Sequence, residues 1–150
     1  MPPVLYYFLQ KSGNKMIKGF KVRLFPNEVQ TQLLWKHINA SRFVWNYALA
    51  EQSNRYKNGE KHLNKYGMRD IFIALKQSEE YAWLKEVSAH TIGNVCIDLD
   101  KAYTSFFKRV SGRPKFKKKG KCKNTFPVRY ENVYFANNCV NIEKIGKIKY

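Results

Sequence analysis

The stretch SGRPKFKKKGKCKN, residues 111–124, concentrates side chains suited to chemistry on a polyanion. Nine cations and no acid lie between positions 108 and 123: Lys108, Arg109, Arg113, Lys115, Lys117, Lys118, Lys119, Lys121 and Lys123. Cations of this kind neutralise phosphates and release counterions, and each contact adds about one unit to the dependence of affinity on salt. Phe116 suits either stacking on a base or anchoring the segment to the protein. Gly112 and Pro114 favour a shaped crossing, so the pattern predicts nucleic-acid contact rather than a solvated lysine run.

Two further groups could contact phosphates or bases. Arg42 and Asn46 are four residues apart in SRFVWNYA and share one face of a predicted helix. Structural capping and nucleic-acid contact are both open for this pair. Lys21 and Arg23 lie on the outer face of the alternating stretch KGFKVRLF.

The sequence predicts no catalytic residue, metal site or cofactor. Two-metal nucleases need carboxylates that converge on the ions, whereas Asp98 and Asp100 are two apart on a predicted helix and point in different directions. The histidines lack metal-ligand spacing, and Ser or Cys nucleophile signatures are absent.

The composition predicts a folded, basic protein. The 150 residues are 44% hydrophobic, which is too much for a disordered chain, and carry a formal charge of +17. This charge favours nucleic acid as the partner, with an anionic membrane surface as the lesser option. Residues 1–25 have five bases and no acid, residues 26–107 ten bases and nine acids, and residues 108–150 thirteen bases and two acids. Both basic ends could therefore form one surface around a neutral insert.

Three cysteines without CxxC spacing suit a reduced, cytoplasmic protein. The apolar opening VLYYFL is shorter than a signal-peptide core and has no basic region before it, so neither secretion nor membrane insertion is expected, and no membrane is predicted as the partner.

Hydrophobic periodicity predicts the elements that position these residues. A strand over 18–25 precedes a helix that begins after Asn27, a second helix from about 40 to 56, a third capped by Asn64, a short turn over 78–84 and a long helix capped by Ser88. Short strands are then expected in TFPVRY, NVYFA, CVNIE and KIKY. Because a lone strand is not stable, the first strand should pair with the late ones. The fold class is therefore α+β, with a helical bundle inserted after the first strand of a small β-barrel or sheet.

The stretch from 16 to 49 resembles the start of the transposon-encoded TnpB (OrfB) proteins of the IS200/IS605 class, which are RNA-guided nucleases. The matching positions are Lys21, Arg23, Leu24, Pro26, Gln30, Leu33, Leu34, Arg42, Phe43 and Asn46. The motifs WLKEV, DLDKAYTSFFKR and GRPKFKKKGK follow in the family's order.

The resemblance implies a wedge-type β-barrel interrupted by a helical recognition domain of helix-turn-helix type, both contacting guide RNA and target DNA. It implies four segments: an upstream extension over 1–15, with Met16 as an alternative start; the first barrel strand over 16–25; the helical insert over 26–110; and the basic connector with the remaining strands over 111–150. In the family, cutting is done by a following RuvC-like domain that this chain does not reach. The expected function is therefore binding of guide RNA or transposon-end DNA without catalysis.

Two alternatives remain open from the sequence. A stand-alone DNA-binding regulator of a transposon would prefer one duplex sequence. An adaptor would use the helical insert to bind a partner, including a full-length relative.

Overall fold

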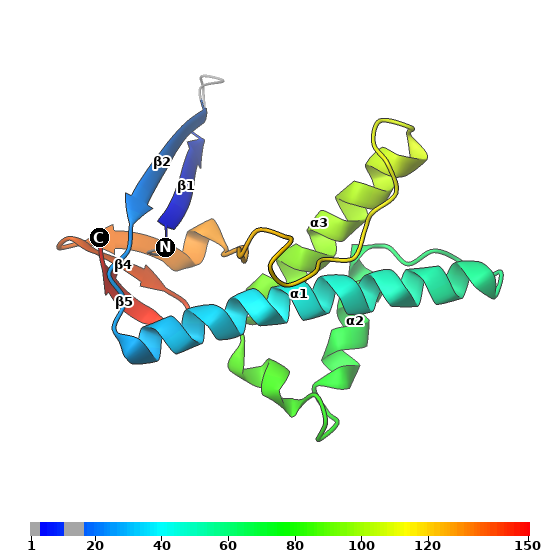
Figure 1. The fold of residues 1–150 in the computed structure, drawn as a ribbon, viewed down its shortest axis with the longest axis horizontal. Coiled ribbons are helices and arrows are strands. Elements are labelled where there is room, and N and C mark those ends of the chain that lie inside the picture. The colour runs from blue at the N-terminus through cyan, green and yellow to red at the C-terminus, as the bar shows by residue number, and fades with distance from the viewer. Residues whose placement is uncertain (1–3, 11–16) are drawn as a thin grey trace. The chain divides into compact units, whose positions relative to one another are not determined.

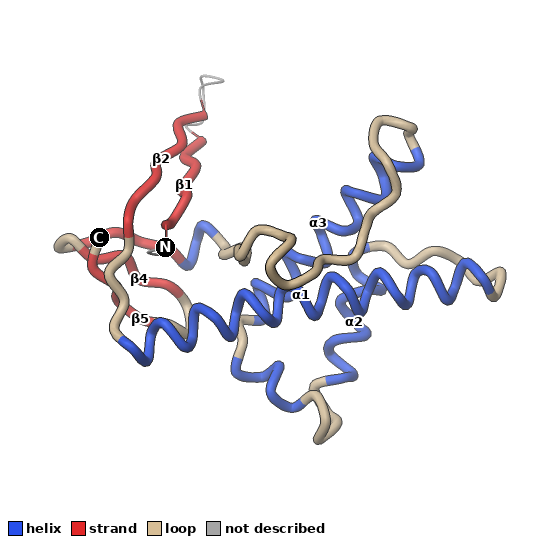
Figure 2. The backbone as a smooth tube through the Cα atoms, in the orientation of Figure 1, coloured by secondary structure: helices blue, strands red, loops and turns tan. Residues whose placement is uncertain are grey.

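The computed structural model describes residues 4–10 and 17–150, which form two compact units. One unit, the strand unit, combines the described residues up to Leu34 with residues 130–150, and the other, the helical unit, comprises residues 35–129. Figure 1 shows the strands of the first unit and the helices of the second, and Figure 2 separates helix, strand and loop by colour.

The strand unit contains two antiparallel sheets. Strand β1 (Val4–Gln10) pairs along its length with β2 (Ile17–Arg23), and β3 (Val133–Ala136), β4 (Cys139–Ile142) and β5 (Gly146–Lys149) form a three-stranded meander. Asn137 and Asn138 join β3 to β4 at φ angles of 52° and 56°, the left-handed region that asparagine tolerates in tight hairpins. Among residues 19–34 and 130–150 of this unit, the buried apolar side chains are Leu24, Leu34, Val133, Val140, Ile142, Ile145 and Ile148.

The predicted barrel is not formed by the described strands, and both sheets are open. The first predicted strand meets the late strands at one bridge, where the Phe25 amide donates to the Lys149 carbonyl at 2.8 Å. Its main partner is β1, from the segment expected to be an upstream extension. Pairing β2 with β1, a seven-residue strand close in sequence, costs less loop-closure entropy than pairing it with the distant four-residue strands. Those late strands also pair with one another already.

Helix α1 (Glu28–Lys57) is one continuous helix of 30 residues, so the expected break between two helices near residue 40 was wrong. The segment holds no Gly or Pro, and the buried His37, Ala40, Ser41 and Val44 continue one face through the expected break. At its start, Asn27 and Gln30 exchange side-chain hydrogen bonds to each other's amides, at 2.8 and 3.1 Å, as in a capping box.

The remaining helices agree with the periodicity and the caps. Helix α2 (Lys65–Leu75) is capped by Asn64, η1 (Ala82–Glu86) is a short 3-10 turn, and α3 (Ala89–Phe107) is capped by Ser88. They pack with α1 around a core of fully buried side chains that includes Val44, Leu49, Met68, Phe72, Leu84 and Leu99. TFPVRY was wrongly predicted as a strand: residues 125–129 are irregular and Tyr130–Asn132 is a 3-10 turn (η2), because Pro127 has no amide to give to a ladder.

None of the helices in the described part of the chain is long and apolar enough to cross a membrane.

Candidate nucleic-acid interface

The basic connector, residues 108–123, is an ordered segment that leaves α3 and crosses the helical unit. Arg109 turns the chain out of α3 at a φ of 59°, and the Val110 amide donates to the Ser105 carbonyl at 2.9 Å. The connector then runs back over α1 (Figure 1). The main-chain groups that such a path turns toward the helices are shielded from water and need partners in the protein.

Asn46 of α1 supplies two of these partners. Its side-chain carbonyl accepts from the Lys117 amide at 2.8 Å, and its side-chain NH₂ donates to the Lys117 carbonyl at 2.9 Å. One residue earlier on the helix, the Trp45 indole donates to the Lys115 carbonyl at 2.9 Å. Three hydrogen bonds therefore fix the connector backbone at two alternate residues.

Side-chain contacts extend the attachment on both sides. Upstream, the Arg113 guanidinium lies 3.4 Å from the Ser53 hydroxyl, and downstream Arg42 donates to Asn124 at 3.1 Å. Further along, the Thr91 hydroxyl of α3 donates to the Pro127 carbonyl at 2.9 Å. The segment from 113 to 127 is thus held against both α1 and α3.

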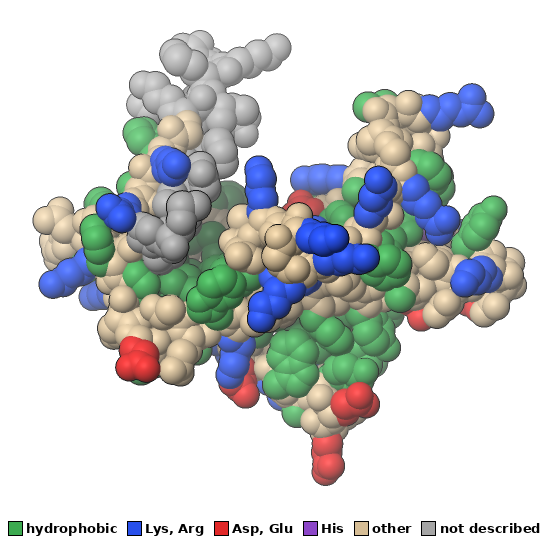
Figure 3. Space-filling view, viewed as in Figure 1, with side chains coloured by type: hydrophobic (Ala, Val, Ile, Leu, Met, Phe, Trp, Pro, Cys, Tyr) green, Lys and Arg blue, Asp and Glu red, His purple; other side chains and the backbone are tan. Residues whose placement is uncertain are grey.

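Most of the connector cations remain exposed although the backbone is held. Exposed side chains belong to Lys108, Arg109, Arg113, Lys115, Lys118, Lys119, Lys121 and Lys123, and Phe116 is 54% exposed. In the helical unit, Lys and Arg gather over the connector and the end of α3 in Figure 3, while most acids visible there lie toward α2 and η1. Cations on a fixed backbone form a ready surface for phosphates.

Lys117 differs from its neighbours because it is partly buried. Its ammonium lies 4.0 Å from the centroid of the Trp45 ring, a cation–π contact. Burial lowers the pKa of Lys117, and the nearby charge of Asp98 opposes that shift. Burial also raises the pKa of Asp98, while Lys101 and Lys117 act in the opposite direction. The two groups form the charged part of a partly desolvated site beneath the connector.

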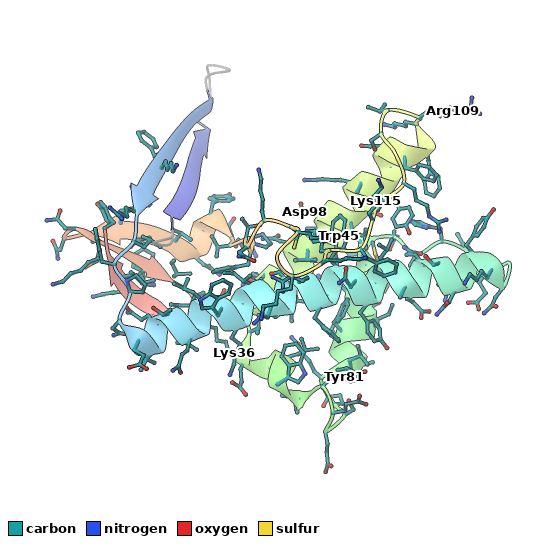
Figure 4. All side chains as sticks on the ribbon, in the orientation of Figure 1. Lys36, Trp45, Tyr81, Asp98, Arg109 and Lys115 are labelled. Atoms are coloured by element: carbon teal, nitrogen blue, oxygen red, sulfur yellow. The ribbon has the colours of Figure 1, made fainter. Side chains whose placement is uncertain are left out.

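The structure brings together some of the predicted residues and separates others. Arg42, Asn46, Arg113 and the central connector lysines meet over α1, whereas Arg109 lies at the far end of α3 (Figure 4). Lys21 and Arg23 are exposed on β2 in the strand unit. Asn46 and Arg42 hold the connector and its flank, which is a structural role different from the capping considered from the sequence. Their contact with nucleic acid stays a prediction.

Sequence reasoning missed two residues of this region, Trp45 and Asp98. Trp45 lies directly beside Asn46, and Asp98 stands among apolar residues of α3, four after the polar Asn94. Figure 4 shows both side chains where the connector passes over α1 and α3. No local pattern distinguishes either residue, because Asp98 shares its side of α3 with Asn94 and Lys101.

Within residues 4–10 and 17–150, no group of three or more His, Cys, Asp or Glu side chains is placed to hold a metal ion.

Comparison with known proteins shows which proteins parts of this chain resemble. Residues 16–61 match the helix-turn-helix domain of OrfB proteins of the IS605 type. In the structure these residues contain β2 and α1, so the matched region is built on one long helix.

Two curated relatives are similar over a larger part of the chain. "Putative RNA-guided DNA endonuclease InsQ" of Escherichia coli K12 is 32% identical over 106 residues, which are 71% of this chain and 26% of the relative. "Putative RNA-guided DNA endonuclease" of Streptomyces pristinaespiralis is 26% identical over 104 residues, 69% of this chain and 26% of the relative. The chain carries the OrfB-type helix-turn-helix domain and is homologous to TnpB-like proteins, of which it spans about a quarter.

Proposed function

We propose that this chain binds nucleic acid through the exposed cations of its basic connector, with Lys21 and Arg23 of β2 as further phosphate contacts. The observation that supports it is the fixed backbone of the connector: Asn46 and Trp45 hold Lys115 and Lys117 by their main-chain atoms and leave the neighbouring lysine side chains exposed. A solvated lysine run would need no such attachment. Because the backbone is already ordered, binding loses less conformational entropy than it would for a flexible tail.

The names of the relatives suggest the ligands. A protein that acts on DNA under the direction of RNA must contact both, so the proposed ligands are structured guide RNA and transposon-end DNA. We propose that the described residues bind these without cutting them. Labelled hairpin and duplex probes incubated with the chain and Mg²⁺ should stay intact, and specific cleavage would contradict this part of the proposal.

A charge-matched pair of variants tests the interface. Replacing Lys118, Lys119 and Lys121 by Ala removes three exposed connector cations, and replacing Lys57, Lys61 and Lys147 by Ala removes three exposed cations elsewhere. Affinity for an RNA hairpin and a DNA duplex is measured by fluorescence anisotropy over a range of KCl concentrations. Each lost phosphate contact should reduce the slope of log affinity against log salt by roughly 0.7 to 0.9.

We expect the connector variant to lose two to three such contacts, roughly two units of slope, and the control to keep the parent slope. Equal slopes for the two variants would place the phosphate contacts elsewhere. Binding that does not depend on salt in the parent chain would exclude the proposed function altogether.

A further inference from the structure

A pocket of about 230 Å³ lies beneath the connector within the helical unit. Three segments line it: α1 through Ser41 and Trp45, α3 through Val95 and Asp98, and the chain from Lys117 to Pro127. Pockets for drug-sized ligands start at roughly 300 Å³, so this one suits a single small planar group. Asp98 lines the pocket and is exposed, so the pocket is open to solvent beside this residue.

The pocket contains a polar atom without a partner. Ser41 is 5% exposed, and its hydroxyl makes no hydrogen bond within the described residues. Buried hydroxyls are nearly always hydrogen-bonded, because an unsatisfied one keeps the cost of leaving water without a compensating bond. An unpaired hydroxyl in the wall of an open pocket is therefore a place for a ligand atom.

The other walls select the chemistry of that ligand. Trp45 and Phe126 contribute aromatic rings to the lining, which suits a flat ligand, and the Lys117 ammonium already lies over one face of Trp45 at 4.0 Å from its centroid. The Asp98 carboxylate repels phosphate but accepts N–H donors, while the Lys117 ammonium can donate to a carbonyl oxygen. A phosphate would thus remain outside with the exposed lysines, and a neutral ring with donors and an acceptor would enter.

Among the nucleobases, guanine offers the best match to this set. Its Watson–Crick edge carries two adjacent donors, N1–H and the N2 amino group, which a carboxylate can accept together, and its O6 is an acceptor for Lys117. Adenine and cytosine each lack the second adjacent donor, and uracil or thymine has one N–H between two carbonyls. Bases become available to such pockets when they are unpaired in loops or turned out of the stack.

We propose that this pocket binds the base of one unpaired guanine nucleotide, with Asp98 and Ser41 as its specificity-determining residues. The proposal rests on the nucleic-acid binding proposed above and adds a base-reading site to it. The connector cations hold the backbone of the strand, and the pocket beneath them reads one of its bases.

The test uses the full chain and stem-loop probes in two arms, RNA and DNA. Each probe has a loop of uridine or thymidine with one central guanine, which is replaced in sister probes by inosine, adenine or an abasic site. We expect the guanine probe to bind about tenfold more tightly than the adenine and abasic probes, with inosine between them because it lacks the N2 amino group. Preference in one arm alone identifies the type of strand that supplies the base.

Ser41→Ala and Asp98→Asn should each reduce the guanine preference to about twofold or less while the salt slope stays at the parent value. Asp70→Asn is the control, because Asp70 is exposed on α2 and its replacement changes the net charge equally. Thermal unfolding verifies that both variants fold: Ser41→Ala removes an unpaired hydroxyl and should not lower Tm.

Equal affinity for guanine, adenine and abasic probes in both arms, with salt dependence intact, would overturn the proposal that the pocket binds guanine. The proposed function of the chain would still hold. Preference for adenine over guanine would also overturn the guanine proposal. If none of the probes binds in a salt-dependent way, both proposals are excluded together.

Discussion

Asn46 and Gln52 use their side-chain amides in the same way, although they hold different segments. Asn46 accepts from and donates to the main chain of Lys117, and Gln52 accepts from the Leu63 amide at 3.0 Å and donates to the Leu63 carbonyl at 2.6 Å. A primary amide carries a donor and an acceptor side by side, so it can mimic a neighbouring strand by pairing with both main-chain groups of one residue. Two side-chain amides on α1 therefore position two loops, one at Lys117 and one at Leu63, that lie outside helices and strands.

Replacing Asn46 by Ala should destabilise the chain by about 1–3 kcal/mol, because it leaves the partly buried amide and carbonyl of Lys117 unpaired. Urea unfolding measures this loss, and trypsin should cut the released connector faster. Asn46→Asp should retain the contact with the Lys117 amide and lose the one with its carbonyl, giving a smaller effect. Asn54→Ala, at an exposed site of the same helix, is the control. Unchanged stability and proteolysis in Asn46→Ala would contradict the role given to this amide.

The sequence indicates that Asn46 and the lysines matter but not how they meet. Asn46 and Lys117 are 71 residues apart, and helical periodicity contains no information on contacts at such a separation. The charge and the Gly and Pro residues of the connector are visible locally, so its interpretation as a shaped, basic crossing could be made. The pocket beneath it could not be predicted, since its walls come from three separate segments.

At the scale of elements, the local signals predict where helices start better than where they continue. Asn64 and Ser88 cap α2 and α3 as expected from their types and from the apolar stripes that follow. The continuity of α1 was missed because His37 and Ser41 look like surface residues near a break, whereas both are buried in the folded chain. Tertiary burial thus overrides the local polarity of this part of α1.

The N-cap of α2 gives a clean test at this scale. The Asn64 side chain accepts from the amides of Tyr66 and Gly67 at 3.1 and 3.0 Å. Asn64→Ala should lower the free energy of unfolding by about 1 kcal/mol, because these two amides lose their acceptor. Asn64→Asp should restore most of it, since a carboxylate accepts the same bonds and favours a helix start. A loss below roughly 0.3 kcal/mol in urea unfolding of the Ala variant would mean that the cap contributes little.

For the whole molecule, the reactivity of the three cysteine thiols can report unfolding of the helical core. Cys96 is buried in the helical core, and burial raises the pKa of its thiol to about 12, whereas Cys122 and Cys139 are partly exposed. The thiolate is the reactive form, so Cys122 and Cys139 should react with a thiol reagent well before Cys96. Cys96 should become reactive only as urea unfolds the helical core; reaction at a common rate in native buffer would contradict its burial.

The same burial predicts how stability depends on pH. The folded chain keeps the Cys96 proton to about pH 12, while the unfolded chain releases it near the ordinary value of 9.0. The unfolded state therefore binds fewer protons between these values, and stability falls as the pH rises through this window. Below pH 9 the contribution is constant. Urea unfolding at several alkaline pH values should show a shallower fall for Cys96→Ala than for the parent chain, and parallel curves would contradict the assignment.

The attachment of the connector through main-chain atoms also has a consequence for substitutions in it. Its anchors are the backbone of Lys115 and Lys117 and side chains of α1, so the identities of residues 118, 119 and 121 are not constrained by these contacts. Substitutions there can change which ligand is preferred without a corresponding change in foldability. Residues that hold the loop and residues that would choose its ligand are therefore different, which makes these three positions suited to a randomised library.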